Sequence, residues 1–438
     1  MLVTAILKSI VRDGSLCVID ATGRRHTIGD GSPPEATLRL TSKSAEYTLA
    51  FNPALSVGEA YMDGRLVIEE GSLYDFLDVL ARNSVWRSPW MAFFERLGKG
   101  LKQSNPVGRA QRNVAHHYDL SSAFYDIFLD RDRQYSCAYF KGPDDTLEVA
   151  QQNKKRHIAA KLLLDRPGLR VLDIGSGWGG LALYLAEAFG ADVTGVTLSG
   201  EQHSSSIQRA ALSPASERVR FELRDYREVE GPFDRIVSVG MFEHVGKRNY
   251  AEFSARLGEL LSDDGVALIH SIGYADTPGP ITPFIRKYIF PGADLPSLSE
   301  VFTAVEPTGL FVTDVEILRL HYAETLRHWR ERLTARSEEI KALYDERFFR
   351  MWEFYLALCE IGFRRRRNMV FQMQIARRFE IVPLTRSYMD DVERQAEAAP
   401  DALRGHRDIH LVVPSAETEF RSRPGHGMCR CNGNRLGK

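Results

Sequence analysis

Apolar and polar residues follow different patterns in the two parts of this chain. From about residue 114 onward, short apolar runs of strand length alternate with longer segments in which apolar residues recur at helical spacing. The short runs predict strands at 170–174, 192–197, 218–223, 234–239, 265–271 and 310–318, and a charged helical segment covers about 322–363. Helices between successive strands indicate a doubly wound sheet, so we expect an α/β fold.

The first 105 residues carry shorter alternating segments that are interrupted by turn residues, as in Asp30-Gly-Ser-Pro-Pro34. This pattern predicts a small α+β domain over 1–105, followed by the α/β domain over 106–392. The remaining residues, 393–438, are rich in Arg, Pro and Gly, a composition typical of a disordered tail.

The segment 84–113 mixes aromatic and basic residues, with Trp86, Trp90 and Phe93 interleaved among Arg and Lys. Aromatic rings settle at the depth of lipid headgroups while cations meet anionic lipid, so this composition suits a membrane-interface segment. A linker whose aromatic side chains pack on the next domain would have the same composition. The sequence leaves both interpretations open.

Composition excludes several classes of protein. A net charge of -1 and a pI near 6.9 carry no nucleic-acid signature, and no apolar run approaches the ~20 residues of a membrane span. The N-terminus does not fit a secretory signal, and the 5 cysteines are scattered and odd in number, so we expect a cytoplasmic protein without a disulfide framework. His426, Cys429 and Cys431 lie close together, but their Gly- and Arg-rich surroundings do not predict a metal site.

The most informative motif follows the first predicted strand of the α/β sheet. Asp173 lies near the end of that strand, and Gly175, Gly177, Gly179 and Gly180 precede an Ala- and Leu-rich helix. Glycine lets the backbone turn sharply and approach a ligand without a side chain in the way. The helix N-terminus behind the turn offers free amide donors. The motif therefore predicts a nucleotide-type binding site.

Two cofactors compete for this turn. Its spacing satisfies the dinucleotide fingerprint, which also expects an acidic residue at the end of the second strand. The second strand instead ends in Thr197 and Ser199, followed by Gln202. These hydroxyl and amide groups, together with the acid that precedes the glycines, favour S-adenosylmethionine over a nicotinamide cofactor. Asp225 and Tyr226, after the third strand, are placed to reach the adenine.

Chemistry in doubly wound sheets lies at the carboxyl ends of the strands. The fourth strand runs into Glu243 and His244, and the fifth runs into His270. Burying Glu and His is costly unless they are paired or used, so their adjacent positions indicate an active site in one crevice. Alternatively, Glu243 only occupies a helix start, where acidic residues are favoured.

Several further motifs occur in a fixed order: His117-Tyr-Asp-Leu120, Gln134-Tyr-Ser-Cys-Ala-Tyr-Phe140, Asp173-Ile-Gly-Ser-Gly-Trp-Gly179, Val196-Thr-Leu-Ser199, Phe242-Glu-His-Val-Gly246, His270-Ser-Ile-Gly273, Ile289-Phe-Pro-Gly292 and His321-Tyr-Ala-Glu-Thr-Leu326. Over residues 55–390 the chain resembles the cyclopropane-fatty-acyl-phospholipid synthases, a family that includes the mycolic acid cyclopropane synthases. The piece Gly58-Glu-Ala-Tyr-Met-Asp-Gly64 resembles the non-catalytic domain of the longer bacterial members.

The resemblance implies a Rossmann-like class I methyltransferase fold and roles for individual residues. The implied S-adenosylmethionine site consists of Tyr135, Ser136, Asp173, Gly175, Gly177, Gly179, Thr197, Leu198, Ser199, Gln202, Asp225 and Tyr226. A bicarbonate ion would be held by Cys137, Glu243, His270, Tyr322 and the backbone of Ile272. Cys359 matches a cysteine often assigned to the active site, although its Leu- and Ala-rich helix favours a core position.

The implied reaction transfers a methylene group from S-adenosylmethionine to the cis double bond of unsaturated acyl chains in membrane phospholipids. The acyl chain would form a cyclopropane ring through a carbocation, with bicarbonate as the base. Glu243 beside this anion requires either a shared proton or a charged His270. The implied protein is cytoplasmic and peripheral on the inner face of the membrane, with a homodimer as an open alternative.

Two other functions stay open from the sequence. One is a fatty acyl methyltransferase that gives a methyl-branched or methylene product from the same cation. The other is a lipid-binding relative without turnover, which the intact Glu243, His270 and Tyr322 disfavour.

Overall fold

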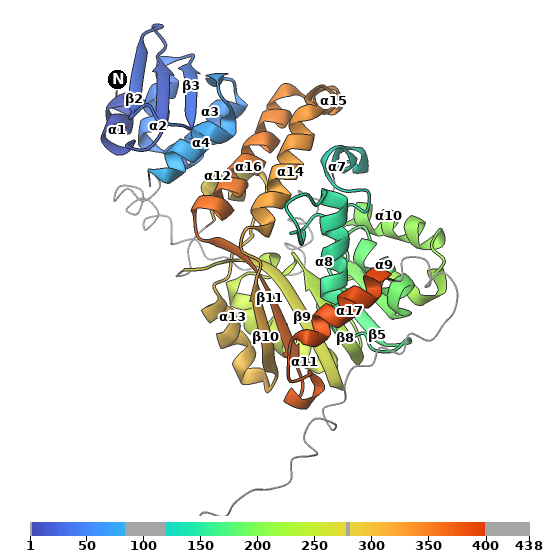
Figure 1. Cartoon of the computed structure of the whole chain (residues 1–438). Helices are drawn as coiled ribbons and strands as arrows, with labels where there is room; N and C mark the ends of the chain where they lie inside the picture. Colours follow the sequence, from blue (N-terminus) through green and yellow to red (C-terminus); the bar gives the residue numbers. More distant parts are fainter. Residues whose placement is uncertain (1, 84–119, 277–280, 399–438) are drawn as a thin grey trace, which may run out of the picture.

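The computed structural model describes residues 2–83, 120–276 and 281–398, which contain two sheets. The smaller sheet has the strand order β2-β1-β3-β4, and the larger has the order β10-β11-β9-β8-β5-β6-β7. Figure 1 shows the smaller sheet at one end of the molecule and the larger sheet at the other, with helices between them. The segment 84–113, the predicted boundary at 105 and the cluster of His426, Cys429 and Cys431 lie outside the described residues.

The N-terminal sheet forms where the short apolar segments predict an α+β arrangement. Its strands are β1 (Ser15–Ile19), β2 (Arg25–Gly29), β3 (Glu35–Leu40) and β4 (Leu66–Glu70), and its helices are α1 (Leu2–Ile10), α2 (Lys43–Phe51), α3 (Pro53–Met62) and α4 (Leu73–Arg82). β1 pairs antiparallel with β2 and parallel with β3, and β4 lies antiparallel beyond β3. A capping box starts α4, because the side chains of Ser72 and Asp75 each accept the other's backbone N–H.

The larger sheet confirms the predicted doubly wound α/β fold. Its strands are β5 (Arg170–Ile174), β6 (Asp192–Thr197), β7 (Val219–Leu223), β8 (Phe233–Val239), β9 (Leu261–Tyr274), β10 (Phe311–Ile317) and β11 (Asn368–Ala376). β5 to β9 are parallel to one another, whereas β11 is antiparallel to both β9 and β10. The strand order reverses between β5 and β8, and in such sheets ligands bind at the carboxyl ends of the strands beside this point.

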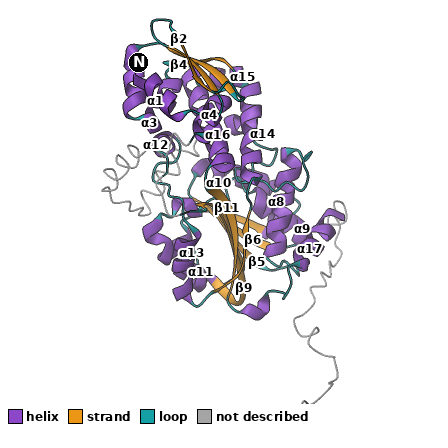
Figure 2. Ribbon diagram, turned by 60° about the vertical axis from the view of Figure 1, so that its left-hand side comes forward, coloured by secondary structure: helices purple, strands orange, loops and turns teal. Residues whose placement is uncertain are grey.

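Helices cover both faces of the larger sheet. They are α8 (Leu147–Lys161), α9 (Gly180–Phe189), α10 (Gly200–Ala211), α11 (Tyr250–Leu260), α13 (Leu298–Val305) and α17 (Ser387–Ala398). Figure 2 shows α11 and α13 on one face, and α8, α9 and α17 on the other. Among the described residues, no helix combines the length and the apolar character that a membrane crossing requires.

The structure corrects the predicted C-terminal part of the sheet. β11 is not among the predicted strands, because its run of apolar residues and glutamines follows a long helix without a clear turn signal. Its pairing with β9 extends from Val266 to Tyr274, so the predicted strand 265–271 continues well past His270. The tail was also expected to start at 393, but α17 continues to Ala398, and the buried Glu393 contacts His157.

A helical layer joins the two sheets. The predicted helical segment consists of α14 (His321–Ala335), α15 (Ser337–Leu343) and α16 (Glu346–Arg365), with α7 (Ser122–Phe128) and α12 (Pro283–Tyr288) beside them. α3 and α4 pack directly on α16: Arg365 forms an ion pair with Asp78, and the Tyr61 hydroxyl donates to Glu353. Apolar residues of the N-terminal part and of this layer form one continuous core.

Candidate active site

A cavity lies at the carboxyl ends of β5, β6, β7 and β8, beside the point where the strand order reverses. Its walls are the glycine turn after β5, the end of β6, the residues that follow β7 and β8, and an extended segment that precedes α8. Most of the predicted cofactor residues therefore meet in one place: Tyr135, Ser136, Asp173, Gly175, Gly177, Thr197, Leu198, Gln202, Asp225 and Tyr226.

The glycine turn needs glycine for two different reasons. Gly175, Gly177 and Gly179 all have left-handed backbone angles, with φ of 84°, 56° and 81°. A Cβ on Gly177 would meet only the Gln202 amide, at 4.0 Å, so it would project beside a residue of the cavity wall. A Cβ on Gly179 would lie 2.5 Å from the Phe221 ring, and Gly179 is absent from the cavity lining. Gly177 thus leaves room for a ligand, whereas Gly179 allows the turn to pack on β7.

Polar atoms in the wall are available to a ligand. Asp173 is buried, and its Oδ2 has no hydrogen-bond partner among the described residues. Burial raises the pKa of Asp173 to about 7, and the Lys154 ammonium opposes this rise. Thr197 donates to the Gln202 side-chain carbonyl at 3.0 Å, which holds that amide at the wall. Ser199, outside the lining, instead caps α10 by accepting the Gln202 N–H.

The outer wall carries aromatic and charged groups. The Tyr135 hydroxyl shares a hydrogen bond of 2.9 Å with the Tyr355 hydroxyl on α16, which links the cavity to the helical layer. Arg227 binds both carboxylate oxygens of Asp225, at 2.8 and 2.7 Å. This carboxylate is therefore already engaged, and its free acceptor capacity is smaller than the sequence implies. Tyr226 beside it presents an aromatic ring to the cavity wall.

Lys154 is not a residue that sequence patterns select, because a lysine on a polar helix is normally solvated. Lys154 is nevertheless fully buried, and its Nζ donates to Gln134 Oε1 at 2.6 Å and to Ser136 Oγ at 2.8 Å. Burial lowers the pKa of this lysine to about 8. Lys154 therefore anchors the extended segment that carries Tyr135 and Ser136. Further wall residues that the sequence does not predict include Arg133, Gln134, Met241 and Asn249.

Glu243 lies in a short turn directly after β8 and contacts β9. Its Oε1 accepts the backbone N–H of Ile272 at 2.6 Å, while its buried Oε2 has no hydrogen-bond partner among the described residues. Burial raises the pKa of Glu243 to about 7. The side chain is thus fixed in place with one free oxygen, and the alternative in which Glu243 only decorates a helix start does not explain this burial.

His270 lies on β9 two residues before Ile272, and it is buried. Burial, and secondarily the cations Lys154 and Lys161, lower its pKa well below the usual value, so the ring is neutral at neutral pH. Of the two ways to place an anion next to Glu243, a shared proton is therefore favoured over a charged His270.

The segment that carries Cys137 is bonded to α14, the helix that carries Tyr322. The N–H of Ala138 donates to Thr325 Oγ1 at 3.0 Å, and Thr325 lies one helical turn after Tyr322. The Cys137 thiol is buried, which raises its pKa, and it donates to the Ala138 carbonyl at 3.3 Å. Tyr322 packs edge-on against Trp329, with ring centroids 5.8 Å apart.

The predicted catalytic residues do not share the cofactor cavity. Cys137, Glu243, His270, Tyr322 and Cys359 are all absent from its described lining, whereas His244 belongs to it. The sequence predicts that Glu243 and His270, together with His244, point into one crevice; of these three residues, His244 lines the cofactor cavity. Burial lowers the pKa of His244 to about 4, so this ring is neutral as well.

Cys359 is partly buried on α16 and packs against the apolar core. Burial raises the pKa of its thiol to about 12, so a thiolate is not available near neutral pH. We expect Cys359→Ser to keep its rate within about tenfold of wild type, because only a small packing and polarity change results. Initial-rate assays at saturating substrate check this. Complete loss of activity in a folded variant would contradict the core assignment.

The chain resembles proteins of known family. Residues 106–373 match the model of the family "Mycolic acid cyclopropane synthetase". A cyclopropane-fatty-acyl-phospholipid synthase of Escherichia coli K12 is 38% identical over 353 residues, which cover 80% of this chain and 90% of that protein. A probable fatty acid methyltransferase of Pseudomonas putida is 36% identical over 348 residues, which cover 76% and 85% of the two chains.

A solved structure supports the same relationship. The mycolic acid cyclopropane synthase CmaA1, complexed with SAH and CTAB, superposes with a TM-score of 0.59 at 35% identity. The match covers 63% of this chain and all of that one. The family model begins only at residue 106, so the N-terminal sheet and its helices lie outside the residues that it matches.

Proposed function

Because the chain belongs to the mycolic acid cyclopropane synthetase family, we propose that it builds cyclopropane rings on the unsaturated acyl chains of membrane phospholipids, with S-adenosylmethionine as methylene donor. Its fold is the Rossmann-like fold of class I methyltransferases, and it is an S-adenosylmethionine-dependent methyltransferase. The observation that carries the proposal is the buried Glu243 carboxylate, which is fixed by Ile272 and keeps one oxygen free.

The residues of the cavity fit S-adenosylmethionine. The unpartnered oxygen of Asp173 is an acceptor for a cationic amino group, and the space beside Gly177 lets a ligand approach the backbone. The Gln202 amide and the ring of Tyr226 are suited to ribose hydroxyls and to adenine, respectively. Bound S-adenosylmethionine supplies an electrophilic sulfonium methyl, which an otherwise weakly nucleophilic double bond can attack.

The buried polar groups behind the cavity fit a small oxyanion such as bicarbonate. Protonated Glu243 and neutral His270 both carry N–H or O–H donors, and Tyr322 adds a hydroxyl on α14. Bicarbonate there would supply a base for the proton that the new methyl group loses on ring closure. Glu243 would hold the proton shared with this anion, and the aromatic and aliphatic surroundings would keep water away from the carbocation.

A lipid product assay tests the proposal directly. The protein is incubated with vesicles of cis-monounsaturated phospholipid and S-adenosylmethionine whose methyl group carries three deuterium atoms. A cyclopropane product keeps two deuterium atoms and resists catalytic hydrogenation of alkenes, a methylene product keeps two but is hydrogenated, and a methyl-branched product keeps three. Removal and readdition of bicarbonate should lower and then restore the rate. Absence of any labelled lipid would refute the proposed reaction.

Fatty acyl methylation is the second candidate, because the Pseudomonas putida relative is named a probable fatty acid methyltransferase. This reaction would use the same cofactor cavity and the same carbocation on the acyl chain. The deuterium count and the response to hydrogenation together distinguish the products of this candidate from a cyclopropane ring, whereas the site residues are shared by both.

The location is proposed to be peripheral on the inner face of the membrane, since the substrate chains lie in a bilayer. The segment with Trp86, Trp90 and Phe93 lies outside the described residues, so its role rests on the sequence. We expect replacement of these three residues by Ala to weaken vesicle co-sedimentation, because each ring contributes apolar area. Affinity for S-adenosylmethionine should not change. A folded variant that sediments like wild type would assign the segment to internal packing.

A further inference from the structure

The strand that the sequence did not predict brings a glutamine to the proposed anion site. β11 places Gln372 directly opposite His270 of β9, and directly opposite Glu316 of β10 on its other side. Gln372 and His270 are both buried. These three polar side chains thus form a row across adjacent strands in the interior of the sheet.

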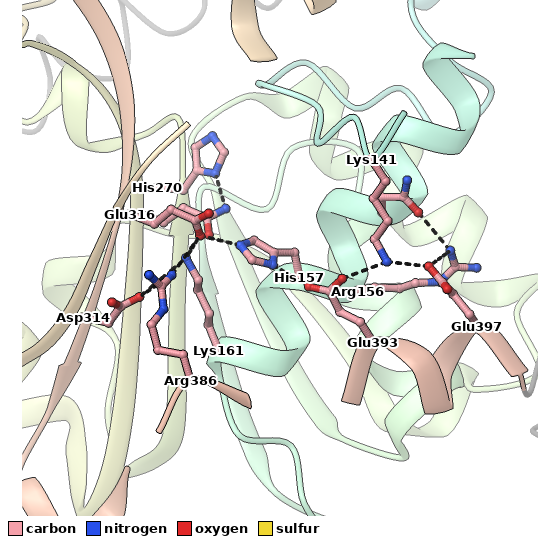
Figure 3. A network of polar contacts seen from close by, with 12 residues as sticks. Lys141, Arg156, His157, Lys161, His270, Asp314, Glu316, Arg386, Glu393 and Glu397 are labelled. Atoms are coloured by element: carbon pink, nitrogen blue, oxygen red, sulfur yellow. Dashed lines mark hydrogen bonds and ion pairs between the residues drawn. The ribbon is translucent and has the colours of Figure 1, made fainter. Parts of the chain in front are cut away.

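The two ends of this row differ in charge. Glu316 accepts hydrogen bonds from His157 Nε2 at 2.7 Å and from the Lys161 ammonium, within an ion network that links α8, β10 and α17. Figure 3 shows His270 at the edge of this network, with Lys161 and His157 beyond Glu316. His270 itself is neutral, because burial and these cations lower its pKa. Gln372 therefore separates a neutral imidazole from a charged cluster.

The contact between Gln372 and His270 selects one tautomer of the ring. The Gln372 amide nitrogen lies 3.1 Å from His270 Nδ1, and an amide nitrogen can only donate. A neutral imidazole that accepts at Nδ1 carries its proton on Nε2. The opposite amide orientation would place a carbonyl against Nδ1, move the ring proton there and leave Nε2 as a lone pair. Such a lone pair would repel an anion.

We propose that Gln372 is a positioning residue that holds His270 in the Nε2–H tautomer, so that this ring donates a hydrogen bond to the bound anion. This inference rests on the proposed function for the identity of the anion, but the tautomer itself is a property of the protein alone. In serine proteases a wrong tautomer of the catalytic imidazole lowers the rate by about 10⁴, which shows the scale of effect that a tautomer has in another enzyme class.

Nitrogen NMR of the protein labelled with ¹⁵N-histidine tests the tautomer without any variant. The His270 signals are assigned by their loss in His270→Asn. We expect a pyridine-type Nδ1 and a pyrrole-type Nε2 in the wild-type protein. A pyrrole-type Nδ1 in the wild type would overturn the inference, even if the enzyme proves to be dependent on bicarbonate.

Two variants and one control test the consequence for the anion. Gln372→Glu introduces an acceptor close to Lys161 and should convert Nδ1 to the protonated form. Gln372→Met removes the donor, and the KM for added bicarbonate should rise at least about tenfold while affinity for S-adenosylmethionine stays within about twofold. Gln374→Met is the matched control, because Gln374 is equally buried on β11 but donates to the Lys161 carbonyl and the Tyr388 hydroxyl.

The outcomes separate this inference from the proposed function. A bicarbonate KM that rises in Gln372→Met and not in Gln374→Met supports the positioning role. Equal effects in both variants, or an unprotonated Nδ1 in Gln372→Glu, would show that Gln372 has only a structural role. A wild-type rate that does not respond to bicarbonate would instead count against the proposed anion. In that case the measured tautomer of His270 would still test whether Gln372 positions the ring.

Discussion

Glu243→Gln is expected to lower kcat by at least ~100-fold, the scale that is usual for losing an acid–base group. The glutamine has the same shape and can still accept the Ile272 N–H, so the local structure is preserved. The amide does not ionise, however, so it has no proton to share with an anion at the proposed site. Affinity for S-adenosylmethionine should stay within a few-fold, because Glu243 is absent from the cavity lining. Calorimetry and initial rates measure the two quantities separately.

The pH dependence follows from the raised pKa of Glu243, about 7 in the folded protein. As the pH rises above this value, Glu243 loses the proton that it would share with the anion, and the bare carboxylate repels that anion. We therefore expect kcat/KM of the wild type to fall above about pH 7, with a limiting slope of about tenfold per pH unit. A pH profile without an alkaline limb near pH 7 would show that Glu243 does not control it.

The free energy of unfolding of Glu243→Gln provides the control for its loss of activity. The folded state raises the pKa of Glu243, so it prefers the protonated form, and the associated stability is lost as the pH rises through about 7. At pH 8 the wild type buries a carboxylate without a cationic partner, whereas the amide is neutral. Glu243→Gln should therefore unfold at the same or a higher urea concentration than the wild type at pH 8. A variant that is less stable and equally active would contradict both arguments.

The glycine turn and its surroundings could be predicted from the sequence because the backbone conformation and the approach of a ligand both require glycine there. Left-handed glycines, an acidic residue and a following helix lie within one short segment, so no long-range information is required. Local spacing does not report the packing of Gly179 against Phe221, a residue some forty positions away. It also does not show that Ser199 serves as a helix cap.

Side chains whose roles depend on long-range contacts could not be predicted from local sequence patterns. Lys154 lies on a polar helix, and only the fold buries it against Gln134 and Ser136. Gln372 lies on a strand that the apolar pattern did not separate from the preceding helix. Both residues are separated in sequence from the groups they contact, and no local spacing rule reports such contacts. The resemblance to a family supplied the residues of the proposed anion site, but not Gln372, which contacts one of them.

Gly177→Val is expected to abolish detectable binding of S-adenosylmethionine. Gly177 has a φ of 56°, and a β-branched residue is strongly disfavoured in this left-handed conformation. Its side chain would also project beside Gln202 in the wall of the cavity, where the ligand must approach the backbone. Strain and steric exclusion therefore act in the same direction. Isothermal titration calorimetry should show a binding signal for the wild type and none for the variant, and NADH should give no signal with either protein.

Gly177→Val both strains the backbone and fills space that the ligand needs. Gly168→Val is the control, because it strains the backbone without filling the cavity. Gly168 has a φ of 74°, and a Cβ there would meet no atom within 4 Å. It precedes β5 at the amino end of the strand and is absent from the cavity lining. Both variants should lose thermal stability, but only Gly177→Val should lose the ligand. If Gly168→Val also fails to bind S-adenosylmethionine while folded, or if Gly177→Val still binds it, then the turn after β5 does not form the cofactor site.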